Sequence, residues 1–204
     1  MSTGDRRIDQ GDKTRVALVR AARKLFRRGY EAVGTPEIAE AAGVTRGALY
    51  HHFKDKRALF AAVVEEVARD HVVEIQRIAM TESDPVDAVI AGCRAFLASA
   101  RDAETRQIYL LDAPAALGWE AWREIDGRHG LGSLRDGLDA CVAAGVMDAA
   151  DVTAAAHLIL GALNEAAFVL VKAKPGSALA ASLDRSMVRM VRALVATDGV
   201  AART

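Results

Sequence analysis

The chain has 204 residues and a net charge of zero, because 27 Lys and Arg balance 27 Asp and Glu. Its two cysteines, Cys93 and Cys141, lie far apart, and its five histidines show no H-x-x-x-H spacing, which excludes the common metal and redox motifs. The N-terminus is polar, so we expect no signal peptide and a reduced, cytoplasmic setting.

The balanced charge hides two blocks of opposite sign. Residues 1–57 hold 13 basic and 7 acidic side chains, a net +6, whereas residues 58–204 hold 14 and 20, a net −6. A basic block followed by an acidic one is typical of a nucleic-acid-binding head on a body with another task. We therefore expect a flexible tail at 1–12, a DNA-binding domain at 13–57 and a second domain at 58–204.

The first elements in chain order are the tail and one helix. Arg6 and Arg7 in the tail are either solvated and disordered or an arm that contacts DNA. A helix is expected at about 14–28, where apolar residues recur with helical spacing.

Residues 35–53 predict two short helices joined by a tight turn. Thr35 is expected to cap the first helix, with Pro36 at its first position. Gly43 suits the left-handed residue that ends it, and Thr45 is expected to cap a second helix. This order is the sequence form of a helix-turn-helix, which places its second helix in the DNA major groove.

The exposed chemistry favours DNA binding over a plain helical corner. Leu49 and Phe53 are expected to face the core, which leaves Arg46, Gly47 and Tyr50 outside. The cluster that can meet phosphates comprises Tyr50, His51, His52, Lys54, Lys56 and Arg57.

The run from Thr14 to Val64 closely resembles the DNA-binding head of the tetracycline-repressor (TetR) family of bacterial transcription regulators. It covers about a quarter of the chain and carries the family's ordered landmarks: Phe26, Gly29, Tyr30, Thr35, Ile38, Ala39, Ala42, Gly43, Val44, Gly47, Leu49, Tyr50, Phe53, Lys56 and Leu59. The resemblance implies a symmetric all-α dimer with two DNA-binding heads and a C-terminal effector pocket.

The same resemblance implies the DNA contacts. Positions that match phosphate contacts are Thr35, Thr45, Tyr50, His51 and Lys56, and those near base edges are Arg46 and Gly47. An arginine can read the O6 and N7 atoms of guanine, and a glycine permits close approach of the backbone.

The rest of the chain reads as helices, at about 56–80, 85–101, 104–112, 118–126, 131–145, 150–173 and 178–196. No strand-like alternation appears. The fold class is therefore all-α, with an N-terminal three-helix helix-turn-helix domain followed by a larger helical domain for ligand binding and dimerisation.

The segment Val152–Val171 is long enough to span a membrane, but Asn164 and Glu165 sit past its middle, so we reject a membrane span. A helix that is apolar on most sides must be covered on two sides, by its own core and by a partner subunit. The residues expected at a homodimer interface are Ala155, Ala162, Ala166, Leu183, Met187 and Met190.

Polar and aromatic residues of the second domain are candidates for an effector pocket. His157, Asn164 and Phe168 share one helical stripe, and they either satisfy one another in the core or orient a ligand. The expected apolar wall consists of Phe96, Tyr109, Trp119 and Trp122, although ordinary packing is the alternative for the two tryptophans.

These features predict a homodimeric repressor that a small-molecule effector releases from a near-palindromic operator in double-stranded DNA. An activator, an effector-independent DNA-binding dimer and a DNA-coating protein without sequence choice are the alternatives. No catalytic constellation is found, so we expect no enzyme, no cofactor and no metal.

Overall fold

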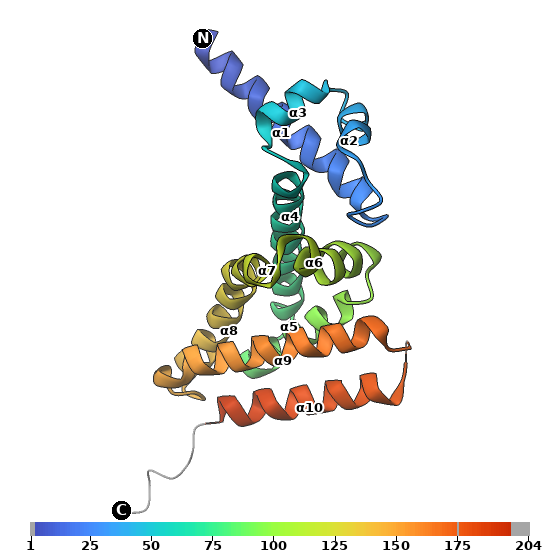
Figure 1. Ribbon diagram of the computed structural model, residues 1–204. Helices are drawn as coiled ribbons and strands as arrows, with labels where there is room; N and C mark the ends of the chain where they lie inside the picture. Colours follow the sequence, from blue (N-terminus) through green and yellow to red (C-terminus); the bar gives the residue numbers. More distant parts are fainter. Residues whose placement is uncertain (1–2, 175, 197–204) are drawn as a thin grey trace, which may run out of the picture. The chain divides into compact units, whose positions relative to one another are not determined.

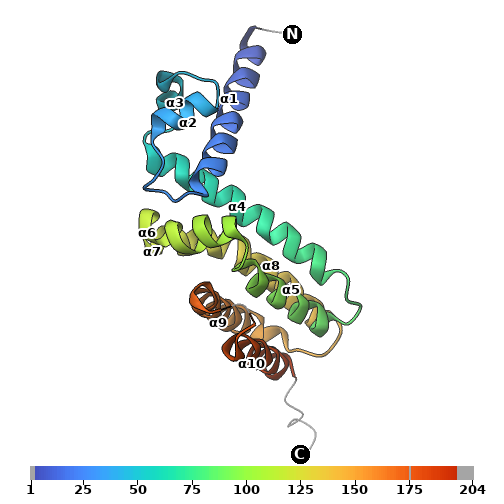
Figure 2. The same ribbon diagram turned by 90° about the vertical axis from the view of Figure 1, so that its right-hand side faces the viewer.

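The computed structural model describes residues 3–174 and 176–196, with side chains from residue 12 onward, and every regular element in these ranges is a helix (Figures 1 and 2). The elements in order are α1 (Thr3–Phe26), α2 (Thr35–Ala41), α3 (Arg46–His52), α4 (Lys56–Ala79), α5 (Pro85–Ser99), η1 (Thr105–Asp112), α6 (Ala113–Leu117), α7 (Trp119–Asp126), η2 (Gly127–Leu131), α8 (Gly132–Ala143), η3 (Ala149–Asp151), α9 (Val152–Lys172) and α10 (Ala178–Val195). The all-α prediction is confirmed.

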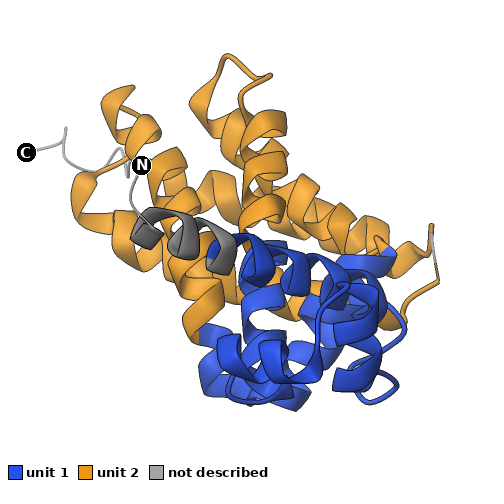
Figure 3. Ribbon diagram, turned by 90° about the horizontal axis from the view of Figure 1, so that it is seen from above, with its two compact units in different colours: residues 1–67, 103–123 blue, residues 68–102, 124–204 orange. Residues whose placement is uncertain are grey.

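The chain forms two compact units (Figure 3). The head unit comprises residues 1–67 and 103–123, and the body unit comprises residues 68–102 and 124–204. Helices α4 and α7 begin in the head unit and end in the body unit. The compact units therefore do not divide at residues 57 and 58, where the charge pattern changes sign, because residues 103–123 pack with the head.

The first helix is longer than the sequence predicts. It begins at Thr3 instead of about Thr14, and it ends at Phe26. The backbone is thus helical in most of the expected tail, while the side chains of Arg6 and Arg7 lie outside the described residues. Gly29, at a φ of 106°, turns the chain after the helix.

An aromatic cluster forms the centre of the head unit. The rings of Phe26 and Phe60 lie 4.9 Å apart and those of Tyr30 and Phe60 lie 4.7 Å apart, so α1 and α4 meet through large apolar surfaces. Leu18, Ile38 and Leu49 add fully buried side chains from the first three helices. The helix-turn-helix therefore packs on α1, and α1 packs on α4.

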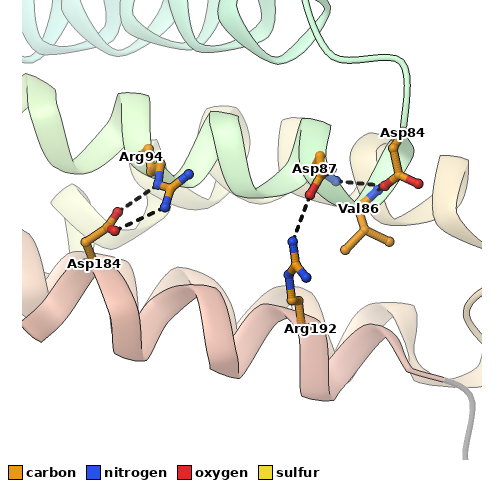
Figure 4. A network of polar contacts seen from close by, with 6 residues as sticks. All are labelled: Asp84, Val86, Asp87, Arg94, Asp184 and Arg192. Carbon is orange, nitrogen blue, oxygen red and sulfur yellow. Dashed lines mark hydrogen bonds and ion pairs between the residues drawn. The ribbon is translucent and has the colours of Figure 1, made fainter.

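The body unit is a bundle in which α5, α8, α9 and α10 pack against one another. Its α5 begins at Asp84, whose carboxylate accepts hydrogen bonds from the backbone N–H groups of Val86 and Asp87. Two ion pairs, Arg94 with Asp184 and Arg192 with Asp87, join α5 to α10 (Figure 4). Because the pairs are exposed, they define the register of the two helices more than they stabilise them.

Burial in the body unit sets the titration of one histidine. His71 is half-buried and its ring stacks on Phe96 at 5.5 Å. Desolvation lowers the pKa of His71 to about 4, although the charge of Asp102 opposes the shift. The unfolded chain, with its ordinary histidine pKa, therefore binds the proton first as the pH falls.

We expect this histidine to weaken the fold in acid. Its contribution to stability is complete above pH 6.5 and is lost as the pH falls toward about 4. Urea unfolding at several pH values should show this decline in the wild type, and His71→Phe should flatten it. An equal decline in the variant would assign the acid sensitivity to other groups.

Helix α9 is the most apolar of the long helices. Within the described part of the chain, Ala149–Lys172 is the one stretch long and apolar enough to cross a membrane, and half of its most apolar window is buried. The core helix of a soluble bundle has the same length and composition, and α9 fills such a core with Ala156, Ile159, Leu163 and Ala167.

The predicted helices of residues 85–196 are confirmed, but two π-helical segments interrupt them. η1 covers eight residues and η2 covers five. A π-helical turn changes the local helical repeat and often lies at a functional position. Apolar periodicity cannot reveal it, because the pattern on either side stays helical.

Candidate nucleic-acid interface

The turn between α2 and α3 is built around Gly43, as predicted. Gly43 has a φ of 68°, and the N–H groups of Gly43 and Val44 donate to the carbonyls of Glu40 and Ala39. These two bonds close the end of α2 and set the angle at which α3 leaves it. The predicted cap of α2 is wrong, because Gly34 holds the cap position and Thr35 is the first helical residue.

Helix α3 has the cap and the orientation that the sequence predicts. The hydroxyl of Thr45 accepts a hydrogen bond from the N–H of Ala48 at 3.1 Å. Leu49 is fully buried and Phe53 is 5% exposed, so this side of α3 belongs to the core. The opposite side presents four exposed residues: Arg46, Gly47, Tyr50 and His51.

Thr35, Tyr50 and Arg46 come together at the surface. The hydroxyls of Thr35 and Tyr50 lie 3.1 Å apart, and the Arg46 guanidinium lies 5.6 Å from the centre of the Tyr50 ring. The hydrogen bond with Thr35, followed by the one with Arg46, lowers the pKa of Tyr50. Because Thr35 is 8% exposed, it orients the Tyr50 phenol from below.

Lys56 and Arg57 stand at the start of α4 but have different surroundings. The Lys56 ammonium lies 4.0 Å from the centre of the Tyr30 ring, which orients it. The Arg57 guanidinium donates to the carbonyls of Ala116 at 3.2 Å and Leu117 at 2.6 Å. Two of the nitrogens of the exposed Arg57 guanidinium are thus engaged at the end of α6, and its place in the phosphate-binding cluster stays a prediction.

Further polar contacts tie α1 and its following turn to residues 103–117. The N–H of Tyr30 donates to the Asp112 carboxylate at 2.7 Å, and Gln107 donates to the other oxygen of that carboxylate at 3.0 Å. Arg23 pairs with Glu104 at 2.8 Å. Sequence reasoning missed Asp112 and Glu104, because their partners lie about 80 residues away along the chain.

The residues predicted to line an effector pocket belong to two units. Tyr109, Trp119 and Trp122 are in the head unit, where Trp122 is fully buried and Trp119 is 58% exposed. The other four are in the body unit: Phe96, His157, Asn164 and Phe168. His157 is exposed and Asn164 is buried, so the two do not share one environment.

The body unit contains a buried polar pair, of which the sequence analysis identified Asn164 but not Asp126. The Asn164 amide donates to the Asp126 carboxylate at 2.7 Å, and the two residues are 3% and 1% exposed. The Asn164 carbonyl oxygen accepts no hydrogen bond from the described residues. Because the amide must face the carboxylate, this oxygen is an acceptor left over for another donor. Asp126 is followed directly by η2.

The predicted dimer residues divide by burial within a single chain. Ala155, Ala166 and Met187 are buried in the body unit itself, and Leu183 and Met190 are half-buried. Ala162 alone of the predicted set is exposed. It lies on a side of α9 that the body unit leaves uncovered.

Two family models match the chain over the segments just described. Residues 18–63 match "Bacterial regulatory proteins, tetR family", and residues 86–194 match "Tetracyclin repressor-like, C-terminal domain". The second match alone spans more than half of the chain. The chain belongs to the tetR family.

Individual tetR-family proteins agree with this assignment. A tetR-family transcriptional regulator from Pectobacterium atrosepticum is 35% identical, with a TM-score of 0.80 over 93% of this chain and 97% of that one. The regulator RolR, solved with resorcinol, shares the fold at 21% identity and a TM-score of 0.72, over 92% of this chain and 95% of RolR.

Curated relatives match over about half of their length. The regulator TtgR of Pseudomonas putida is 34% identical over 109 residues, 49% of each chain, and the repressor AcnR of Corynebacterium efficiens is 31% identical over 96 residues, 43% of this chain and 49% of AcnR. The chain thus spans about half the length of these tetR-family relatives. TetR-family proteins are DNA-binding transcription regulators, and the exposed side of α3 is the candidate interface of this member.

Proposed function

We propose that this tetR-family regulator is a homodimeric repressor that binds a near-palindromic operator and leaves it when a small-molecule effector binds. The observation that carries the proposal is the side of α3 that faces away from the core, where Arg46, Gly47, Tyr50 and His51 are exposed. A rigid, capped helix with this surface suits insertion into a major groove. We place the protein in the cytoplasm, where its DNA is.

The DNA contacts divide into two kinds. Arg46 reads a guanine edge, and phosphate contacts come from Thr45, Tyr50, His51 and Lys56, with Thr35 orienting Tyr50. The two heads of a dimer reach half-sites about 34–36 Å apart or slightly more. The operator is therefore symmetric, as the dimer is.

Gly47 supports a close approach of the DNA backbone to α3. A methyl group at this position would meet only the Thr45 hydroxyl, at 3.8 Å, and the residue sits inside α3 with ordinary helical φ. Glycine in a helix interior is less stable than alanine by about 0.5–1 kcal/mol, and the fold has no use for it here. Contact with the DNA backbone explains the glycine.

Gly47→Ala should raise stability and lower operator affinity together. We expect a gain of about 0.5–1 kcal/mol in the free energy of unfolding. Because the added methyl group enters the DNA contact, we expect roughly tenfold weaker operator binding, equivalent to about 1.4 kcal/mol. Chemical denaturation and fluorescence anisotropy with labelled DNA measure the two effects. Unchanged affinity in a stabilised variant would remove Gly47 from the interface.

Residues 103–117 couple the head to regulation in this proposal. Arg57, Tyr30 and Arg23 hold this segment through the bonds to α6, Asp112 and Glu104. An effector that favours one position of the segment then favours one position of the head. Such coupling requires different effector affinities in the two states.

Loss of the Arg57 contact should weaken release while sparing DNA binding. We expect the operator affinity of Arg57→Ala to stay within about threefold of the wild type, a change well below the roughly 1.4 kcal/mol of a tenfold effect. The reason is that the printed contacts of Arg57 are with α6. The effector concentration that halves operator binding should rise. Arg27→Ala, at another exposed arginine of the head, is the control. The coupling role would be refuted if Arg57→Ala and Arg27→Ala lost operator affinity equally and the effector concentration needed for release stayed unchanged.

Small-molecule control is supported by structural relatives. RolR was solved with resorcinol, and FadR of Bacillus subtilis was solved with stearoyl-CoA, at a TM-score of 0.66 and 19% identity. In this chain the Asp126–Asn164 pair is our candidate for orienting an effector in the body unit. A second candidate function is activation, since the activator FasR of Mycolicibacterium smegmatis is 36% identical over 86 residues.

The direct test is binding of the purified protein to DNA from its own upstream region, against random DNA of equal length at two salt concentrations. We expect a preference of roughly 10³-fold or more, the range of specific regulators. If binding is salt-sensitive but shows no sequence preference, and a genome-wide pull-down finds no preferred sites either, the protein would instead have a DNA-coating role. A promoter fusion measures whether bound protein lowers or raises transcription.

A further inference from the structure

Three basic residues form a row along the side of α1 that faces solvent. Arg20, Lys24 and Arg27 are exposed, and their spacing of i, i+4 and i+7 places them on one side of the helix. Within the described part of the chain no ion pair reaches any of the three, whereas the neighbouring Arg23 pairs with Glu104. We call Arg20, Lys24 and Arg27 the α1 row.

The α1 row points away from the surface that is proposed to bind the operator. Leu18 and Ala22 are fully buried and lie about half a turn of the helix from the row, on the side where α1 packs on α2 and α3. Figure 2 shows α2 and α3 on the same side of α1. DNA against the exposed side of α3 is therefore separated from the row by the head itself.

The body unit carries an acidic surface of similar form on α8. Asp136 and Asp139 are exposed one turn apart, and we call them the α8 pair. Gly132 and Ala143 stand on the same side, four residues before and after the pair, and their short side chains leave room for long ones. Arg135 is near enough in sequence to pair with Asp139, but no ion pair joins these two described residues.

The charges of the two surfaces are complementary. Residues 1–57 carry a net +6 and residues 58–204 a net −6, and DNA binding accounts only for the basic block. On either helix, residues three or four apart have Cβ atoms about 5–6 Å from each other. Two neighbouring cations of the α1 row can therefore face both aspartates of the α8 pair together, which favours an acidic protein surface of this kind as the partner of the row.

We infer that the α1 row of one copy of this chain binds the α8 pair of another copy. The contact joins two different surfaces, so each copy keeps one of them unused, and copies add in an open series. Neither an operator nor an effector is needed for it, so the inference goes beyond the proposed function.

The contact is weak for isolated copies and gains weight on DNA. Exposed ion pairs contribute little individually and are screened by salt. Copies bound at neighbouring sites of one DNA molecule meet at an effective concentration of about millimolar, which populates contacts that are sparse in dilute solution. The contact thus favours occupation of adjacent sites.

Sedimentation of the purified wild-type chain at about 0.01 M and about 1 M salt tests for the contact, because the Debye length falls from about 30 Å to about 3 Å between them. At low salt we expect the average mass to rise with protein concentration without a plateau. At high salt it should fall to one smallest species. That species is the reference whether it is a monomer or a dimer, so the result does not depend on the proposed homodimer.

Reversing two charges of the α1 row tests its part in the contact. Lys24→Glu with Arg27→Glu should weaken the low-salt association at least tenfold. The matched control is Arg101→Glu with Arg106→Glu, which reverses two other exposed cations and changes the net charge equally. It should associate within threefold of the wild type. Circular dichroism should show the same helix content in all three proteins, because every changed side chain is exposed.

Reversing the α8 pair tests the partner. Asp136→Lys with Asp139→Lys should weaken association as the row variant does, and Glu82→Lys with Glu120→Lys is the matched control at two other exposed acids. A chain that carries both the row and the pair reversals has the wild-type net charge and again opposes unlike charges. Its association should return to within threefold of the wild type.

Three outcomes would overturn the inference. The first is a wild-type chain that shows only its smallest species at low salt, and the second is a combined variant that associates as weakly as the row variant. The third is a row reversal that lowers affinity for random DNA while reversal of the α8 pair leaves association unchanged, which would assign the row to DNA phosphates instead. Loss in both reversals with recovery in the combined variant supports the contact.

Discussion

Arg46→Ala is expected to reduce discrimination between the operator and single-base variants by about 1–3 kcal/mol at one position of each half-site, the worth of one bidentate arginine–guanine contact. Arg46 is exposed on α3, and its guanidinium is held near the Tyr50 ring, which limits the conformations it must give up on binding. Competition binding with operators altered at each position measures the effect.

The control separates base reading from charge. Lys54→Ala removes an exposed positive charge just after α3, so it should weaken all sequences alike and lower the salt dependence. Tyr50→Phe and Lys56→Ala should also act on every sequence, because both residues are assigned to phosphate. A uniform loss in Arg46→Ala, with unchanged base preference, would contradict the proposed docking of α3.

Asn164→Leu should lower the free energy of unfolding by about 3 kcal/mol, because it leaves the buried Asp126 carboxylate without its amide donor. The two residues are 3% and 1% exposed and 2.7 Å apart, so water cannot simply replace the lost bond. For a chain of this size the melting temperature should fall by roughly 6–12 °C. Calorimetry at fixed protein concentration measures both quantities.

A double variant distinguishes a polar pair from lost volume. Replacing both Asp126 and Asn164 by leucine should recover much of the stability, because two apolar side chains of similar size need no hydrogen bonds. If the double variant is instead less stable than the wild type by the full sum of the two single effects, the pair is not coupled. The stable double variant should no longer respond to an effector if the pair orients it.

Local sequence patterns were sufficient for the elements of the head. The turn at Gly43, the cap at Thr45 and the inward Leu49 follow from backbone preferences and helical spacing, and the structure confirms each of them. The cap of α2 was misplaced by one residue because Gly34 can take an extended conformation without offering a side-chain bond. Patterns of this kind depend on neighbours within a few positions.

Local sequence patterns did not predict the contacts between distant segments. Arg57 resembles a phosphate ligand in sequence, yet two of its guanidinium nitrogens donate to carbonyls about 60 residues away. His157 and Asn164 share a helical stripe but differ in burial, because the packing of neighbouring helices varies along the stripe. Nothing near Asp126 in the chain indicates that it meets Asn164, 38 residues later.

The sequence by itself determined the helical class, the helix-turn-helix and the surface of α3, because each depends on short-range preferences and a 3.6-residue repeat. Only the tertiary structure decided which basic residues stay free of the fold, which polar groups are buried together and which side of α9 is left uncovered. Those outcomes depend on the desolvation and packing of residues far apart in the chain, and no local pattern encodes them.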